Sequence, residues 1–134
     1  MNQKSVFIGA TDQPSRITQW LIAKNSLGYV DYRNLLLPTL AWQTHHNNQR
    51  WITWIASQFI EKSMLEEYGV NLSSLRMIVD SHSDYSSFKL LLTALKNNRS
   101  SMVIASLPSL SIFQQDELEK AASQGDCQAI ILIH

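Results

Sequence analysis

From residue 50 to the end of the chain, short apolar runs alternate with amphipathic segments. The apolar runs have the length and the β-branched or aromatic content of strands, and they span residues 50–55, 75–79, 102–105 and 129–133. The run at 102–105 is almost wholly apolar, as expected for a strand buried on both faces. Strands that alternate with helices are joined by right-handed crossovers and pair in parallel. The sequence therefore predicts an α/β fold with a mainly parallel sheet.

The segments between these strands carry helix signals. A short helix over 60–68 is closed by Gly69, which tolerates the left-handed conformation of a helix C-cap. A further helix covers 111–124, with Gly125 as its C-cap. The helix before residue 96 is capped by Ser83 or Asp84. Its apolar positions have i, i+3, i+4 and i+7 spacing and are Phe88, Leu91, Leu92 and Leu95.

The first third of the chain has weaker patterns. Residues 6–8 resemble an edge strand, and residues 15–24 are expected to form a helix that presents Ile17, Trp20 and Leu21. Asp31 caps a helix that runs through Leu35 and Leu40 and is kinked by proline at position 38.

Composition limits the function classes. The 134 residues fit one domain, 1–134, and 11 basic side chains balance 11 acidic ones, so no net field favours nucleic acid or anionic lipid. The single cysteine, Cys127, excludes an intramolecular disulfide framework and favours a reducing compartment. The apolar runs are too short for a signal peptide or a membrane span. We expect a soluble, cytoplasmic protein with no nucleic-acid or membrane partner.

Catalytic motifs are weak. The segment 9–15 has one glycine and no lysine, and with four glycines in the chain neither a phosphate-binding loop nor a dinucleotide fingerprint can be assembled. We therefore expect no nucleotide, no other cofactor and no enzymatic activity. Asp80, His82 and Asp84 follow a predicted strand and offer metal ligands at alternate positions, but a fourth ligand is not evident. Helix capping is the favoured role for this segment, and a small metal-dependent hydrolase is the enzymatic alternative.

The two tryptophans of the predicted strand at 50–55 indicate protein binding instead. Trp51 and Trp54 are three residues apart, so on a strand they face opposite sides of the sheet. We expect one of the two side chains to lie in the core. An arrangement in which both are fully buried is less favoured, because Trp is seldom wholly enclosed. Arg50 adjoins them, and Trp and Arg are the side chains most enriched at protein–protein hot spots.

The order of these pieces resembles the SulA family, the cell-division inhibitors of the bacterial SOS response. The likeness runs from Leu35 to Ile133, while residues 1–30 match poorly. The elements that carry it, in order, are the leucine run ending in Pro38, the Arg50-Trp51 pair with Trp54, the short helix ending at Gly69, the strand near Met77, Ala94-Leu95 before Val103-Ile104, and the acidic helix Asp116-Glu117-Leu118 with Ala121-Ala122 and Gly125.

The resemblance implies a RecA-like three-layer domain without its phosphate loop, which binds FtsZ and blocks its polymerisation by capping or sequestering subunits. It also implies a homodimer and recognition by Lon protease as further expectations. We place the FtsZ-binding surface at Arg50, Trp51, Ile55, Met64 and Leu65. Arg50→Ala is expected to fold normally and to bind FtsZ at least about tenfold more weakly. The main alternative is a RecA-like adaptor in DNA-damage tolerance without inhibitor activity.

Overall fold

The computed structural model describes residues 15–22, 33, 36–46, 49–56, 60–79 and 84–133, and for residues 84–86 it describes the backbone alone. They form a five-stranded sheet with the strand order β1-β5-β4-β2-β3, and every neighbouring pair is parallel. The elements in chain order are β1 (Ile17–Leu21), α1 (Leu36–His45), β2 (Trp51–Ala56), α2 (Lys62–Glu67), a 3₁₀ turn (Leu72–Ser74), β3 (Leu75–Val79), α3 (Asp84–Lys96), β4 (Ser100–Leu107), α4 (Ile112–Gly125) and β5 (Gln128–Ile133).

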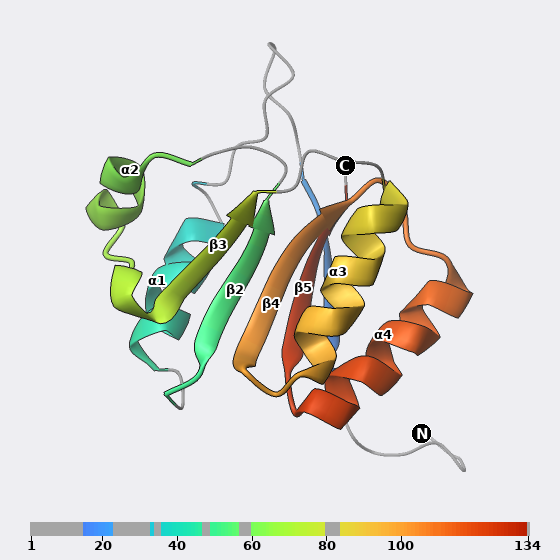
Figure 1. Ribbon diagram of the computed structural model, residues 1–134. Coiled ribbons are helices and arrows are strands. Elements are labelled where there is room, and N and C mark those ends of the chain that lie inside the picture. Colours follow the sequence, from blue (N-terminus) through green and yellow to red (C-terminus); the bar gives the residue numbers. More distant parts are fainter. Residues whose placement is uncertain are drawn as a thin grey trace, which may run out of the picture.

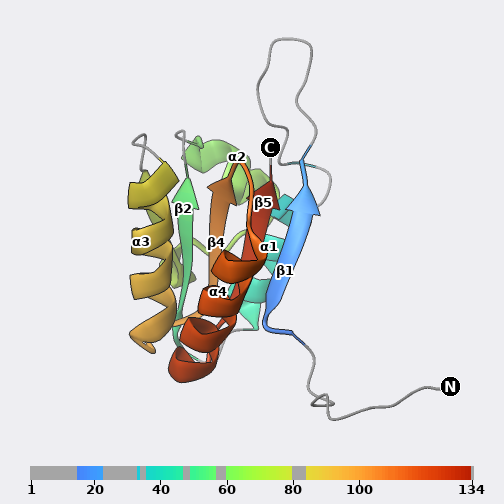
Figure 2. The same cartoon turned by 90° about the vertical axis from the view of Figure 1, so that its right-hand side faces the viewer.

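The sheet lies between two layers of helices, α1 and α2 on one face and α3 and α4 on the other (Figures 1 and 2). The core is accordingly divided into two clusters. One joins α1 and α2 to the sheet around Trp54, and the other joins α3 and α4 to it around Val103 and Ile131. Strand β4 lies between β2 and β5, and most of its side chains are buried, which confirms the strand predicted to be enclosed on both faces.

The prediction of a helix over 15–24 is wrong, because Ile17–Leu21 is the edge strand β1. In a helix Ile17, Trp20 and Leu21 would share one face. In the structure Ile17 packs with the α3–α4 cluster, Trp20 packs with the opposite cluster, and Leu21 is 87% exposed. Pairing with β5 outweighs the local pattern. The Glu119 carboxylate on α4 secures the start of the strand, where it accepts hydrogen bonds from the Ser15 hydroxyl and the next two backbone N–H groups.

The prediction that Pro38 kinks the helix is also wrong, because Pro38 lies in the first turn. Helix α1 begins at Leu36 and continues to His45, so Pro38 is its third residue. The N–H groups of the first turn have no intrahelical acceptor, and proline there removes no bond that the helix needs. Leu36 and Leu37 are buried in the core, as is Leu40. The predicted cap at Asp31, Leu35 and the predicted strand at 6–8 lie outside the described residues.

Two glycines close helices for different reasons. Gly69 follows α2 with φ of +82°, which confirms the left-handed position predicted for it. Gly125 is instead the last residue of α4, and the left-handed C-cap is Asp126, with φ of 50°. Glycine is needed at 125 because a Cβ there would lie 1.7 Å from the Leu95 carbonyl oxygen. The C-terminal turns of α3 and α4 therefore meet backbone to backbone.

Candidate partner-binding surface

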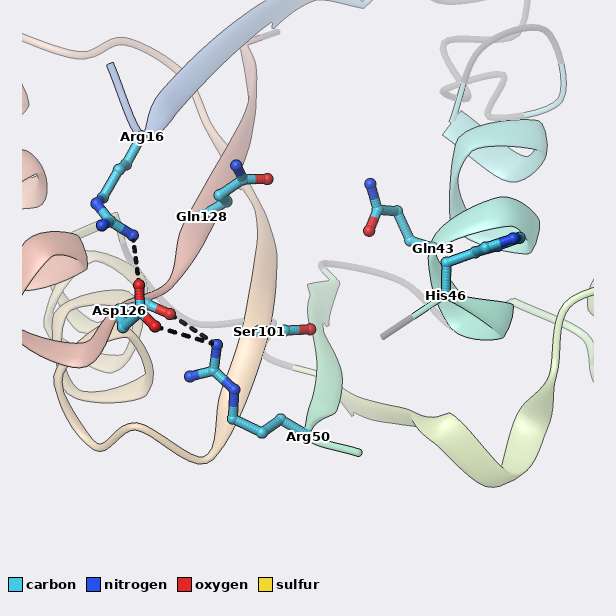
Figure 3. A pocket seen from close by; sticks show the side chains of 7 residues that line it. All are labelled: Arg16, Gln43, His46, Arg50, Ser101, Asp126 and Gln128. Atoms are coloured by element: carbon cyan, nitrogen blue, oxygen red, sulfur yellow. Dashed lines mark hydrogen bonds and ion pairs between the residues drawn. The ribbon is translucent and has the colours of Figure 1, made fainter. Parts of the chain in front are cut away.

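A polar pocket of about 230 Å³ lies where the strands begin (Figure 3). Ligands of α/β proteins usually bind at the opposite edge, beyond the carboxyl ends of the strands. The pocket draws its side chains from segments that are distant in sequence, and they are Arg16, Gln43, His46, Arg50, Ser101, Asp126 and Gln128.

The Arg50 side chain, at the start of β2, forms hydrogen bonds to the turn after α3 and to the C-terminal end of α4. Its Nη1 donates to Asn98 Oδ1 over 2.7 Å, and to the Gly125 carbonyl oxygen over 3.3 Å. Its Nη2 donates to the Asp126 carbonyl oxygen over 2.8 Å. The residue that opens β2 is thus bonded to the turn after α3 and to the C-terminus of α4. A cation at a helix C-terminus is also favoured by the helix dipole. The side chain keeps 23% of its surface exposed.

Asp126 balances part of the positive charge of the pocket. Its carboxylate lies 3.0 Å from Nη1 of Arg16 and 3.9 Å from Nη2 of Arg50. Figure 3 shows the two guanidinium groups on either side of this carboxylate. The hydroxyl oxygen of Ser101 is buried and has no hydrogen-bond partner among the described residues. Among the described side chains that line the pocket, the two arginines and the one carboxylate leave one excess positive charge.

The two tryptophans of β2 occupy different environments, as predicted. Trp54 is fully buried in the cluster beneath α1 and α2. Trp51 is 41% exposed, and its ring lies 5.9 Å from the guanidinium carbon of Arg76, a cation–π arrangement. Trp51 therefore belongs to the molecular surface beside Arg50.

The structure separates the other residues of the proposed FtsZ surface. Ile55 is 3% exposed and packs in the α3–α4 cluster, and Leu65 is 4% exposed and packs in the opposite cluster. Neither side chain is available for direct contact, so we do not retain them as contact residues. Met64 is half-buried against the α1–α2 cluster and keeps part of its surface outward. Arg50, Trp51 and Met64 remain the proposed contacts.

A further aromatic residue at this end of the molecule was not singled out from the sequence. Trp42 on α1 is 57% exposed, and its ring stacks on that of His46 with centroids 4.0 Å apart and planes 7° from parallel. The Nδ1–H of His46 donates to the Trp42 carbonyl oxygen over 2.8 Å. His45 and His46 are both exposed at the end of α1, and the His45 Nε2 lies 2.9 Å from the Gly69 carbonyl oxygen. The i, i+4 spacing of Trp42 and His46 is the signal that predicts this stack.

The metal site considered for Asp80, His82 and Asp84 falls on a segment that the structure does not describe in full. Asp80 and His82 lie outside the described residues, as does the side chain of Asp84. Among the side chains that the structure does describe, no three His, Cys, Asp or Glu residues are grouped to hold a metal ion. Of the described helices, none combines the length and the apolar composition of a bilayer-spanning segment.

Comparison with known proteins gives a structural likeness alone. The sequence matches no protein-family model and none of the curated proteins. The structure superimposes on the crystal structure of SulA from Pseudomonas aeruginosa with a TM-score of 0.76, covering 90% of this chain and 98% of that one. The fold is that of SulA. The two sequences are 22% identical over this likeness. The SulA-like α/β domain expected from the order of motifs is therefore confirmed as a fold.

Proposed function

We propose that this protein inhibits bacterial cell division by binding FtsZ and blocking its polymerisation, as part of the SOS response to DNA damage. The observation that carries the proposal is the SulA fold, which extends over 98% of the Pseudomonas protein. The order of motifs from Leu35 to Ile133 supports the same family. Inhibition is stoichiometric, by capping or sequestering subunits in the cytoplasm, and needs neither a catalytic residue nor a cofactor.

Two of the contacts that we propose, Arg50 and Trp51, lie where β2 begins, and the third, Met64, lies on α2 on the α1–α2 side of the sheet (Figure 1). Trp51 offers an exposed aromatic ring, Arg50 a partly exposed guanidinium, and Met64 a flexible apolar side chain. Trp, Arg and Met are enriched in protein–protein interfaces, and Trp and Arg carry a large share of hot-spot energies. Trp42 adds a second exposed indole on α1. These residues support a protein ligand better than a small molecule, because the aromatic rings lie on the surface rather than inside a cavity.

The test is expression in a rod-shaped bacterium together with sedimentation of purified FtsZ in the presence of GTP. The expected results are long unseptated filaments in the cell and an FtsZ pellet that shrinks as the protein approaches equimolar amounts. Trp51→Ala should weaken both effects, whereas Ile112→Ala, which removes an exposed apolar side chain from the start of α4, should not. Normal division together with an undiminished FtsZ pellet would reject the proposal and favour the adaptor reading. Light scattering and degradation by purified Lon test the homodimer and Lon expectations separately.

A further inference from the structure

Arg76 is a half-buried cation for which the described part of the chain supplies no carboxylate. Its Nη2 donates to the Thr53 hydroxyl over 3.2 Å, and its buried Nε has no acceptor in the part of the chain that the structure describes. The remaining contact is with the face of the Trp51 ring. A guanidinium carries five donors and an obligatory charge. In this partly buried position the Nε–H has no acceptor among the described residues, and the contacts described for the guanidinium, the Thr53 hydroxyl and the Trp51 ring, carry no negative charge.

The hydroxyls next to Arg76 belong to a short hydrogen-bonded chain across three strands. Thr53 on β2 is paired in register with Arg76 on β3, and its Oγ1 lies 2.6 Å from Oγ of Ser100 on β4. Thr53 and Ser100 are fully buried. The Thr53 hydroxyl accepts from Arg76, and either of the two hydroxyls can be the donor in the bond between Thr53 and Ser100. These hydroxyls hold the guanidinium in place but contribute no negative charge, so within the described part of the chain Arg76 is positioned without a carboxylate.

The described helices cover the face that carries Arg76 mainly over β4 and β5, and less over β2 and β3. Helix α3 packs on β4 and only slightly on β2. Figure 1 shows α3 and α4 over the right-hand strands, while the front of β2 and β3 has no described helix above it. Arg76, Thr53 and Trp51 lie on this open part, and β3 is the edge strand. An approaching protein therefore meets an aromatic ring beside a cation that has no carboxylate partner among the described residues.

We propose that Arg76 is a specificity-determining residue of the partner surface and pairs with an Asp or Glu side chain of the bound FtsZ subunit. The inference rests on the proposed function and goes beyond the contacts Arg50, Trp51 and Met64. The carboxylate approaches beside Trp51 and accepts from the free guanidinium donors, while the indole packs against apolar atoms of the same segment. A bidentate carboxylate matches the planar fork of arginine, which lysine cannot reproduce.

The test compares three Arg76 variants with a charge control in FtsZ sedimentation at low and high salt. Arg76→Gln and Arg76→Met remove the charge, and Arg76→Lys keeps it without the fork. Lys120→Gln removes one positive charge from the far helix α4, where the side chain is 78% exposed and paired only with Asp116 among described residues. We expect the two neutral variants to inhibit at least about tenfold more weakly, the lysine variant to be intermediate, and Lys120→Gln to match the wild type.

Salt separates an ionic contact from a merely structural role. The neutral variants should lose part of the salt sensitivity that the wild type shows, because a screened charge pair is missing from their complex. Thermal melts establish that each variant is folded. Should Arg76→Gln not fold, Arg76→Met decides, since its thioether can pack against Trp51. A folded neutral variant that inhibits like the wild type overturns this inference and leaves the proposed function intact. A wild-type protein without effect on FtsZ overturns the proposed function, and this inference with it.

Discussion

Replacing Arg50 by alanine tests whether this residue stabilises the fold as well as any complex. The substitution removes three hydrogen bonds, to Asn98 and to the backbone carbonyls of Gly125 and Asp126. It also removes a cation from the C-terminus of α4. The sequence alone predicts that Arg50→Ala folds normally, because an exposed arginine contributes at most about 1 kcal/mol through a surface ion pair. The bonds in the structure predict a measurable loss of stability.

The size of the loss follows from the number and the exposure of these bonds. A hydrogen bond from a charged donor contributes roughly 1.5–3 kcal/mol when it is buried. The Arg50 side chain is 23% exposed, and water can reach part of this pocket, so each bond contributes less than that. We expect a total decrease of about 2 kcal/mol in the free energy of unfolding. In a chain of 134 residues this corresponds to a fall of about 5–10 °C in Tm.

Denaturant and thermal unfolding of Arg50→Ala measure this directly, with Arg16→Ala as the matched control. Among the described residues Arg16 makes one ion pair, with Asp126, and its own side chain is 38% exposed, so its loss should cost no more than about 1 kcal/mol. Equal Tm values for Arg50→Ala and the wild type would refute the structural role of the three bonds. FtsZ sedimentation well below the Tm then isolates the binding role. A folded Arg50→Ala that inhibits at the wild-type stoichiometry would show that the partner contact lies elsewhere.

Three other perturbations have effects that the structure specifies. Gly125→Ala should destabilise by more than about 3 kcal/mol or prevent folding, because its Cβ would meet the Leu95 carbonyl oxygen. Thr44→Val should cost about 1–3 kcal/mol, since the buried Thr44 hydroxyl accepts from the Asn71 backbone N–H. Burial raises the pKa of the Cys127 thiol to about 11, so the native protein should resist thiol reagents up to pH 9 and react on unfolding. The unfolded thiol ionises first, so this group lowers stability as pH rises from about 9 to about 11.

A control variant or a contradicting result tests each of these three predictions. Thr93→Val removes a hydroxyl that only bonds back to Lys89 on an exposed helix face, and it should leave the unfolding free energy nearly unchanged. A Thr44→Val variant as stable as Thr93→Val contradicts the bond to Asn71. A Gly125→Ala variant that keeps the wild-type Tm would mean that α3 and α4 are further apart than the structure has them. Rapid labelling of native Cys127 at pH 7 would contradict its burial.

The sequence predicted the candidate surface only where residue type itself carried the signal. Arg50 and Trp51 stand out because of their chemistry and their position before a strand, and the structure places both at the surface. Ile55 and Leu65 do not differ in type from residues that face outward, and only packing shows that they are buried. Arg76 has no distinguishing neighbour in the sequence. The role proposed for it depends on its bond to Thr53, 23 residues away, and on the absence of a carboxylate partner among the described residues.

The strands and helices after residue 50, and their parallel arrangement, were determined by the sequence alone, because periods of 2 and 3.6 residues are properties of the local backbone. The sequence also sufficed for Gly69, whose positive φ is a local requirement. Tertiary structure alone decided that Ile17–Leu21 is a strand, since its short pattern suits either element and its partner β5 lies more than 100 residues away. It also decided the strand order, and with it the meeting of Arg16, Arg50 and Asp126. Such contacts depend on which edges and faces pair across the sheet, and no local spacing encodes that choice.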